Sequence, residues 1–71
     1  MTKKSFIEAT QYKHNQVIDF NGLHIGIVGW LNNPWMIVNT TNFDEITDRQ
    51  YEPIASFHTR EELWQHIKAQ A

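Results

Sequence analysis

Residues 16–30 read QVIDFNGLHIGIVGW, and this stretch sets the fold that the rest of the chain must follow. Asn21 and Gly22 at its centre are typical of a two-residue type I′ turn, because both tolerate the positive φ that this turn requires. The turn places Phe20 opposite Leu23 in an antiparallel hairpin. One face of that hairpin then carries an apolar side chain at every second position, at Ile18, Phe20, Leu23, Ile25 and Ile27. A slip of one residue would turn this stripe to the other face, so the pattern specifies the register.

The next turn toward the C-terminus is predicted at LNNP, the four residues before Trp35. Proline fixes its own φ and keeps the preceding residue out of the helical region, which favours a turn here. A four-residue loop would place Trp30 opposite Trp35. The third strand, WMIVNT, would then add Met36 and Val38 to the face that carries the apolar stripe. The first three strands therefore predict an antiparallel meander.

Residues 39–53 are mainly polar and predict a long loop, with Phe43, Ile46 and Tyr51 as candidate anchors against the body of the protein. Residues 54–57 then predict a short fourth strand. Pro53 lacks a backbone donor, which suits the start of that strand or a sheet edge.

A helix over about residues 60–69 is predicted from its start signal. Thr59 and Glu62 form a capping box, in which the threonine hydroxyl accepts a hydrogen bond from a free amide at the helix start. Acidic residues in the first turn and Lys68 near the last suit the helix dipole. The apolar positions share one face at spacings of three and four: Leu63, Trp64, Ile67 and Ala71. We expect this face to cover the apolar stripe of the sheet.

These elements predict one small α+β domain spanning residues 1–71, a three- to four-stranded antiparallel meander with a C-terminal helix packed on one face (ββββα). Residues 1–14 hold few large apolar groups, and they could form a short helix, an edge strand or an arm, either ordered or flexible. A chain of 71 residues buries only roughly 60% of its unfolded surface. It contains no cysteine, so disulfides cannot add stability. A well-packed core or a partner subunit must therefore supply the stability.

The sheet face opposite the predicted helix carries the candidate interaction site. On the predicted register this face is apolar, and its residues are Val17, Val28, Trp30, Trp35 and Ile37. A half-exposed antiparallel sheet normally shows polar residues there, and large exposed apolar patches mark interfaces. Two interpretations remain open. The tryptophans could form a cross-strand pair that residues 1–14 cover, or the face could pack on another chain, most simply an identical one.

Charge and composition disfavour several classes of function. The net charge is −2, and the six basic residues are scattered, so nucleic-acid binding is disfavoured because phosphate affinity needs clustered Lys and Arg. The N-terminal residues lack the apolar segment of a secretory signal. The most apolar stretch is interrupted by His24 and by residues 32–34, so it cannot span a membrane. A cytoplasmic location is expected.

No pattern of catalytic or metal-binding residues is present. The four histidines have no ligand spacing, and His24 opposite Asp19 predicts an ordinary cross-strand surface pair. The acidic residues Asp44, Glu45 and Asp48 lack the glycine and final glutamate of a calcium loop, and a solvated loop explains them. We therefore expect no enzyme activity, no metal and no cofactor.

The sequence thus favours a small acidic protein–protein interaction module. It would use the Trp-bearing sheet face, either as a homodimer or as a regulatory or inhibitor subunit bound to another protein. The alternative is a single-stranded nucleic-acid-binding sheet protein, which would need basic residues interleaved with the tryptophans. Those basic residues are missing on the predicted face.

Overall fold

The computed structural model describes residues 2–11, 15–47 and 52–70. The elements in chain order are α1 (Lys3–Ala9), β1 (Gln16–Phe20), β2 (Leu23–Ile27), β3 (Trp35–Val38), α2 (Phe43–Thr47), β4 (Ala55–Phe57) and α3 (Arg60–Gln70). The strands form one antiparallel sheet in the order β1-β2-β3-β4. The predicted fold class, an α+β meander with a C-terminal helix on the sheet, is confirmed.

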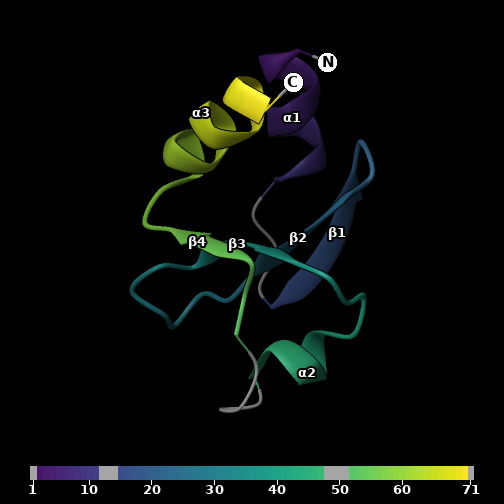
Figure 1. The fold of residues 1–71 in the computed structure, drawn as a ribbon, viewed down its shortest axis with the longest axis vertical. Helices are drawn as coiled ribbons and strands as arrows, with labels where there is room; N and C mark the ends of the chain where they lie inside the picture. Colours follow the sequence, from purple (N-terminus) through teal and green to yellow (C-terminus); the bar gives the residue numbers. More distant parts are fainter. Residues whose placement is uncertain (1, 12–14, 48–51, 71) are drawn as a thin grey trace.

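The elements stack in three layers (Figure 1). Helices α1 and α3 lie side by side over one face of the sheet, whereas α2 lies on the opposite side. Of the alternatives predicted for the N-terminal segment, residues 3–9 form the short helix, α1. Thr2 caps this helix through a capping box with Ser5, and Phe6 anchors the helix in the core.

The first hairpin has the predicted register. Asn21 and Gly22 have φ values of 52° and 83°, as a type I′ turn requires. Phe20 pairs with Leu23, and every following pair along β1 and β2 continues that register. The turn residues and the apolar stripe both specify this register, so the sequence predicts the first hairpin correctly.

The second hairpin has a different register from the predicted one. Trp35 pairs with Ile27, whereas the sequence predicts Trp30 as its partner. Ile27 lies three positions before Trp30 in the chain. The amide of Val28 donates to the carbonyl of Pro34 at 3.0 Å, so the paired region ends there and Trp30 lies in the loop beyond it. Because three is odd, the shift turns each side chain of β3 to the opposite face. Trp35 therefore faces α1 and α3, where Met36 had been expected.

The sequence of β3 explains why the pattern of apolar residues predicts the wrong register for this strand. Its residues, WMIV, are all apolar and all buried in the fold, so the strand has no polar position to indicate which face is which. Continuous apolar strands of this kind occur where both faces of a sheet are covered. The register was decided instead by how well each face packs on its helix.

Two separate clusters of buried side chains form the core. The larger lies between the sheet and helices α1 and α3: Phe6, Phe20, Ile25, Ile27, Trp35, Ile37, Leu63, Trp64 and Ile67, with Ile18, Leu23 and Phe57 packed against it. The smaller lies between the sheet and α2: Val28, Met36, Val38 and Ile46, with Val17 and Phe43 packed against it. The predicted packing of α3 on the stripe of the first hairpin is confirmed.

Helix α2 replaces part of the long loop predicted for residues 39–53. Asn42 begins it by accepting a hydrogen bond from the amide of Asp44 at 2.9 Å. Ile46 is buried and Phe43 partly buried, as expected of anchors, whereas Tyr51 lies outside the described residues. Gly26 allows the close approach of α2, because a Cβ there would lie 3.0 Å from Cδ1 of Ile46.

The C-terminal half of the prediction is close to the structure. Strand β4 begins one residue later than expected and α3 ends one residue later. The amide of Glu62 donates to the Thr59 hydroxyl at 3.1 Å, as the capping box predicts. In the described part of the chain, none of the helices has the length and apolar character to cross a membrane.

Candidate interaction surface

The structure does not bring the five predicted interface residues onto one open face. Trp35 and Ile37 are buried in the larger cluster beneath α1 and α3. Val28 is buried, and Val17 partly buried, in the smaller cluster beneath α2. Trp30 is the exception, with 62% of its surface exposed. The expected open apolar sheet face is therefore wrong, because the shifted register divides its residues between two helix-covered faces.

Trp30 is unlike the other tryptophans of the chain. Trp35 and Trp64 are 9% and 6% exposed, and both belong to the larger cluster. Trp30 instead lies in the loop between β2 and β3, next to Leu31, which is 44% exposed. Two adjacent large apolar side chains on a loop are unfavourable in water, and such residues are typical of binding surfaces.

The loop that carries Trp30 is held by hydrogen bonds at several points. The amide of Leu31 donates to the carbonyl of Val28 at 3.2 Å, and the amide of Gly29 donates to Oδ1 of Asn15 at 3.4 Å. Together with the closing bond from Val28 to Pro34, these bonds define the path of the loop. A binding loop that is already ordered loses less entropy on association.

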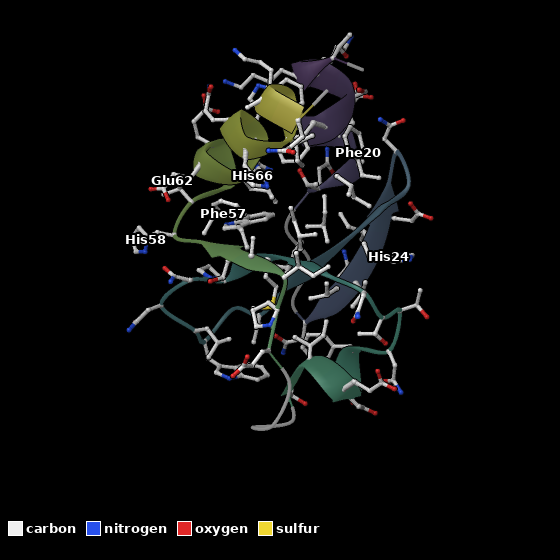
Figure 2. All side chains as sticks on the ribbon, in the orientation of Figure 1. Phe20, His24, Phe57, His58, Glu62 and His66 are labelled. Carbon is white, nitrogen blue, oxygen red and sulfur yellow. The ribbon has the colours of Figure 1, made fainter. Side chains whose placement is uncertain are left out.

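His58 fastens the far side of the same loop. Its Nδ1 lies 2.8 Å from the carbonyl oxygen of Asn32, and because a carbonyl can only accept, Nδ1 carries the proton. Figure 2 shows His58 on the outer side of the connection between β4 and α3. The contact ties the loop to an element 26 residues away in sequence.

Phe43 of α2 supports the Trp30 ring. The two rings meet edge to face, with centroids 6.3 Å apart and planes at 87°, which is a favourable geometry for aromatic pairs. We call Trp30, Leu31 and Phe43 together the Trp30 surface. Asp44 and Glu45, both exposed, follow Phe43 directly in α2. Two exposed carboxylates therefore lie within two residues of Phe43.

Sequence reasoning missed two members of this surface. Leu31 had been placed in a polar turn and Phe43 was predicted only as a loop anchor. A usable signal was present, since Trp30 and Leu31 adjoin the turn residues Asn32 and Asn33. Apolar residues at the tip of a connection cannot face a core that the strands themselves fill.

The other described histidines, His24 and His66, lie apart in different surroundings, and His14 lies outside the described residues. His24 is the cross-strand partner of Asp19, as predicted, and its buried Nδ1 has no hydrogen-bond partner among the described residues. The His66 ring packs against Phe57 with centroids 5.1 Å apart, between α3 and β4 (Figure 2). In residues 2–11, 15–47 and 52–70, the structure places no three His, Asp or Glu side chains suitably to hold a metal ion.

The clearest charge interaction lies at the other end of the molecule. The Lys3 ammonium group of α1 donates to Glu61 of α3 at 2.9 Å, and the side-chain Nε2 of Gln65 donates to the same carboxylate at 3.3 Å. These hydrogen bonds, with that from Lys3 the stronger cause, lower the pKa of Glu61 below its ordinary value of 4.5. Both side chains of the ion pair are about half exposed, so the pair contributes little to stability.

Comparison of the chain with protein-family models, with curated proteins and with solved structures finds no match.

Proposed function

We propose that this chain is a small protein-interaction module that recognises another protein through the Trp30 surface. The observation that carries the proposal is the 62% exposure of Trp30 in a loop fixed by hydrogen bonds and by the Phe43 ring. Tryptophan is among the residues that contribute most to binding at protein interfaces. An ordered tryptophan pays less entropy on binding than a mobile one.

A different chain fits this surface better than a second copy. The sequence-based case for a homodimer depended on an open apolar sheet face, and the chain's own helices cover both faces. The remaining large exposed apolar side chains on described residues are dispersed, with Ile7 on α1 and Ile54 before β4. Stable dimers usually bury about 800 Å² on each partner, which dispersed side chains do not supply. Binding and occluding a partner, as a regulatory or inhibitor subunit, suits such a module.

The proposal is tested by comparing the wild-type chain with Trp30→Ala. Each would be immobilised and exposed to the same extract of the native host cells. A protein retained by the wild type and lost by Trp30→Ala would then be purified and its affinity measured by calorimetry. We expect Trp30→Ala to weaken binding about 30-fold, which corresponds to the roughly 2 kcal/mol typical of a central interface residue.

Ile7→Ala is the matched control, because Ile7 is also an exposed apolar residue but lies on α1. It should leave the affinity unchanged. Equal binding by wild type and Trp30→Ala would contradict the proposal. A concentration-dependent dimer in sedimentation velocity, dissociated by Trp30→Ala, would overturn the choice of a different chain as partner.

A further inference from the structure

On the residues that the structure describes, the charged side chains that directly follow Phe43 in α2 are both acidic. Asp44 and Glu45 lie in the first turn of α2, and no basic residue occupies its last turn. The described lysines and arginine lie elsewhere: Lys3 and Lys4 on α1, Arg60 and Lys68 on α3. Those two helices occupy the opposite end of the molecule from α2 (Figure 1). Two exposed carboxylates therefore lie within two residues of Phe43, and the described cations of this chain lie on the far side of the sheet.

The two aromatic rings form a corner suited to a cation. Their planes are nearly perpendicular, at 87°, so a group placed in the corner can meet the negative face of each ring. A Lys or Arg side chain is attracted to a tryptophan face within about 6 Å of the ring centroid. Asp44 and Glu45 follow Phe43 directly and are both exposed, so they add negative potential at the end of the molecule that carries α2.

The chain already contains one such contact, at the start of α3. The guanidinium carbon of Arg60 lies 5.7 Å from the centroid of the Trp35 ring. Arg60 also donates to the carbonyl of Thr10 at 3.3 Å, which fixes the cation over that ring. Trp35 thus receives a cation from its own chain, whereas Trp30 presents an exposed ring that packs on Phe43.

We infer that the Trp30 surface binds a basic segment of the partner protein, with a Lys or Arg side chain in the corner of Trp30 and Phe43 and an apolar neighbour on Leu31. This inference depends on the proposed function and adds the chemistry of the partner. The carboxylates of Asp44 and Glu45 select against acidic segments and against nucleic-acid phosphate. Charge attraction of this kind raises the association rate and falls with salt.

The inference can be tested with synthetic peptides of opposite charge. The acetylated, amidated peptide Lys-Leu-Lys-Leu-Lys and its counterpart Glu-Leu-Glu-Leu-Glu would be titrated into ¹⁵N-labelled protein at low ionic strength. We expect the lysine peptide to shift the Trp30 indole signal and the Leu31 amide, and the glutamate peptide to shift neither. Raising the salt concentration to 0.5 M should weaken the binding.

Variants separate the contributions of ring and charge. Trp30→Leu keeps an apolar side chain but removes the aromatic face, and should weaken binding of the lysine peptide roughly two- to fivefold. The double variant Asp44→Asn, Glu45→Gln should also weaken it. The matched control is Glu61→Gln, Glu62→Gln, which makes the same charge change in the first turn of α3 and should leave the affinity unchanged.

Equal binding of the two peptides would overturn the inference, as would wild-type affinity in the double variant at Asp44 and Glu45. The spectra of each variant also report whether the remainder of the chain keeps its fold. Should Trp30→Ala abolish binding of a purified partner while the lysine peptide does not bind, the proposed function stands and the basic partner is wrong. If Trp30→Ala binds both the purified partner and the lysine peptide as tightly as the wild type does, the proposed function and this inference are both wrong.

Discussion

The two faces of the sheet are covered in different ways. Helices α1 and α3 enclose a cluster of nine buried side chains, four of them aromatic. On the other face the five-residue helix α2 encloses a cluster of four buried aliphatic side chains, and Trp30 at its border stays exposed. The comparison shows a division of roles: the larger cluster provides most of the buried apolar area, while the smaller one positions the candidate interaction surface.

The difference also explains where an interaction site can form. A short helix such as α2 gains little stability from its own hydrogen bonds and depends on docking. The loop between β2 and β3 meets α2 through the contact of Trp30 with Phe43, and Trp30 stays exposed there. The more complete layer of α1 and α3 leaves less apolar surface available, since Trp64 and Phe6 pack on each other at 5.2 Å.

The largest effect is expected from Phe6→Ala in the larger cluster. Phe6 is almost fully buried, and its ring contacts Phe20 at 5.4 Å and Trp64 at 5.2 Å between centroids. Removing a buried phenylalanine ring costs about 3–5 kcal/mol, out of a total of roughly 4–11 kcal/mol for a domain this size. Urea denaturation should show a strongly lowered midpoint. The neighbouring Ile7→Ala is the control and should change stability little; a loss below about 1 kcal/mol for Phe6→Ala would contradict the layered core.

A smaller effect is expected on the α2 side from Gly26→Val. A Cβ at Gly26 would lie 3.0 Å from Cδ1 of Ile46 and 3.2 Å from Cγ of Met36. Overpacking of this kind typically costs about 1–3 kcal/mol. Ile46→Val removes the clashing Cδ1, so the double variant should recover part of the loss in urea denaturation. Strict additivity of the two substitutions would show that α2 does not dock as described.

The two helix caps offer a matched comparison at about 1 kcal/mol each. Thr59→Ala removes the bond to the amide of Glu62 in α3, and Asn42→Ala removes the bond to the amide of Asp44 in α2. Because α3 belongs to the larger cluster, Thr59→Ala should lower the global free energy of unfolding. Asn42→Ala should act first on local opening, seen as faster amide hydrogen exchange in α2. The two faces would not differ in this way if both variants lost the same global free energy of unfolding and amide hydrogen exchange in α2 did not change.

The smallest effect is expected from pH at the junction of α1 and α3. The pKa of Glu61 is lowered by its bonds from Lys3 and Gln65, so the ionised form stabilises the fold. This contribution is present above pH 4.5, the ordinary value, and is lost as the pH falls through the lowered folded-state value. Glu61→Gln should therefore show a slightly weaker fall in Tm than the wild type between pH 5 and about pH 3. Identical pH profiles would show that the ion pair contributes nothing.

Local signals in the sequence predicted much of the fold. The Asn21–Gly22 turn fixed the first hairpin, and Thr59 marked the start of α3, because each depends only on neighbouring residues. The second hairpin was misread because β3 is apolar at every position and its preceding loop is longer than four residues. Helix α2 was not predicted because five residues carry too little periodicity to be recognised.

The candidate interaction surface could be predicted from the sequence only in part, for the same reason. Trp30 was among the five predicted residues, but its neighbours Leu31 and Phe43 were not. Phe43 comes from a segment separate from the loop, and its edge-to-face contact with Trp30 depends on where α2 docks. Trp35, predicted beside Trp30, instead lies under the guanidinium of Arg60.

The strand order, the register of the first hairpin and the C-terminal helix follow from local sequence signals, because turn residues, alternation and caps act over a few positions. Tertiary structure alone decided the face to which β3 turns Trp35 and Ile37, and with it the isolation of Trp30 at the rim. Both registers of an all-apolar strand bury similar side chains, so only the packing of α1, α2 and α3 on the two faces selects one of them.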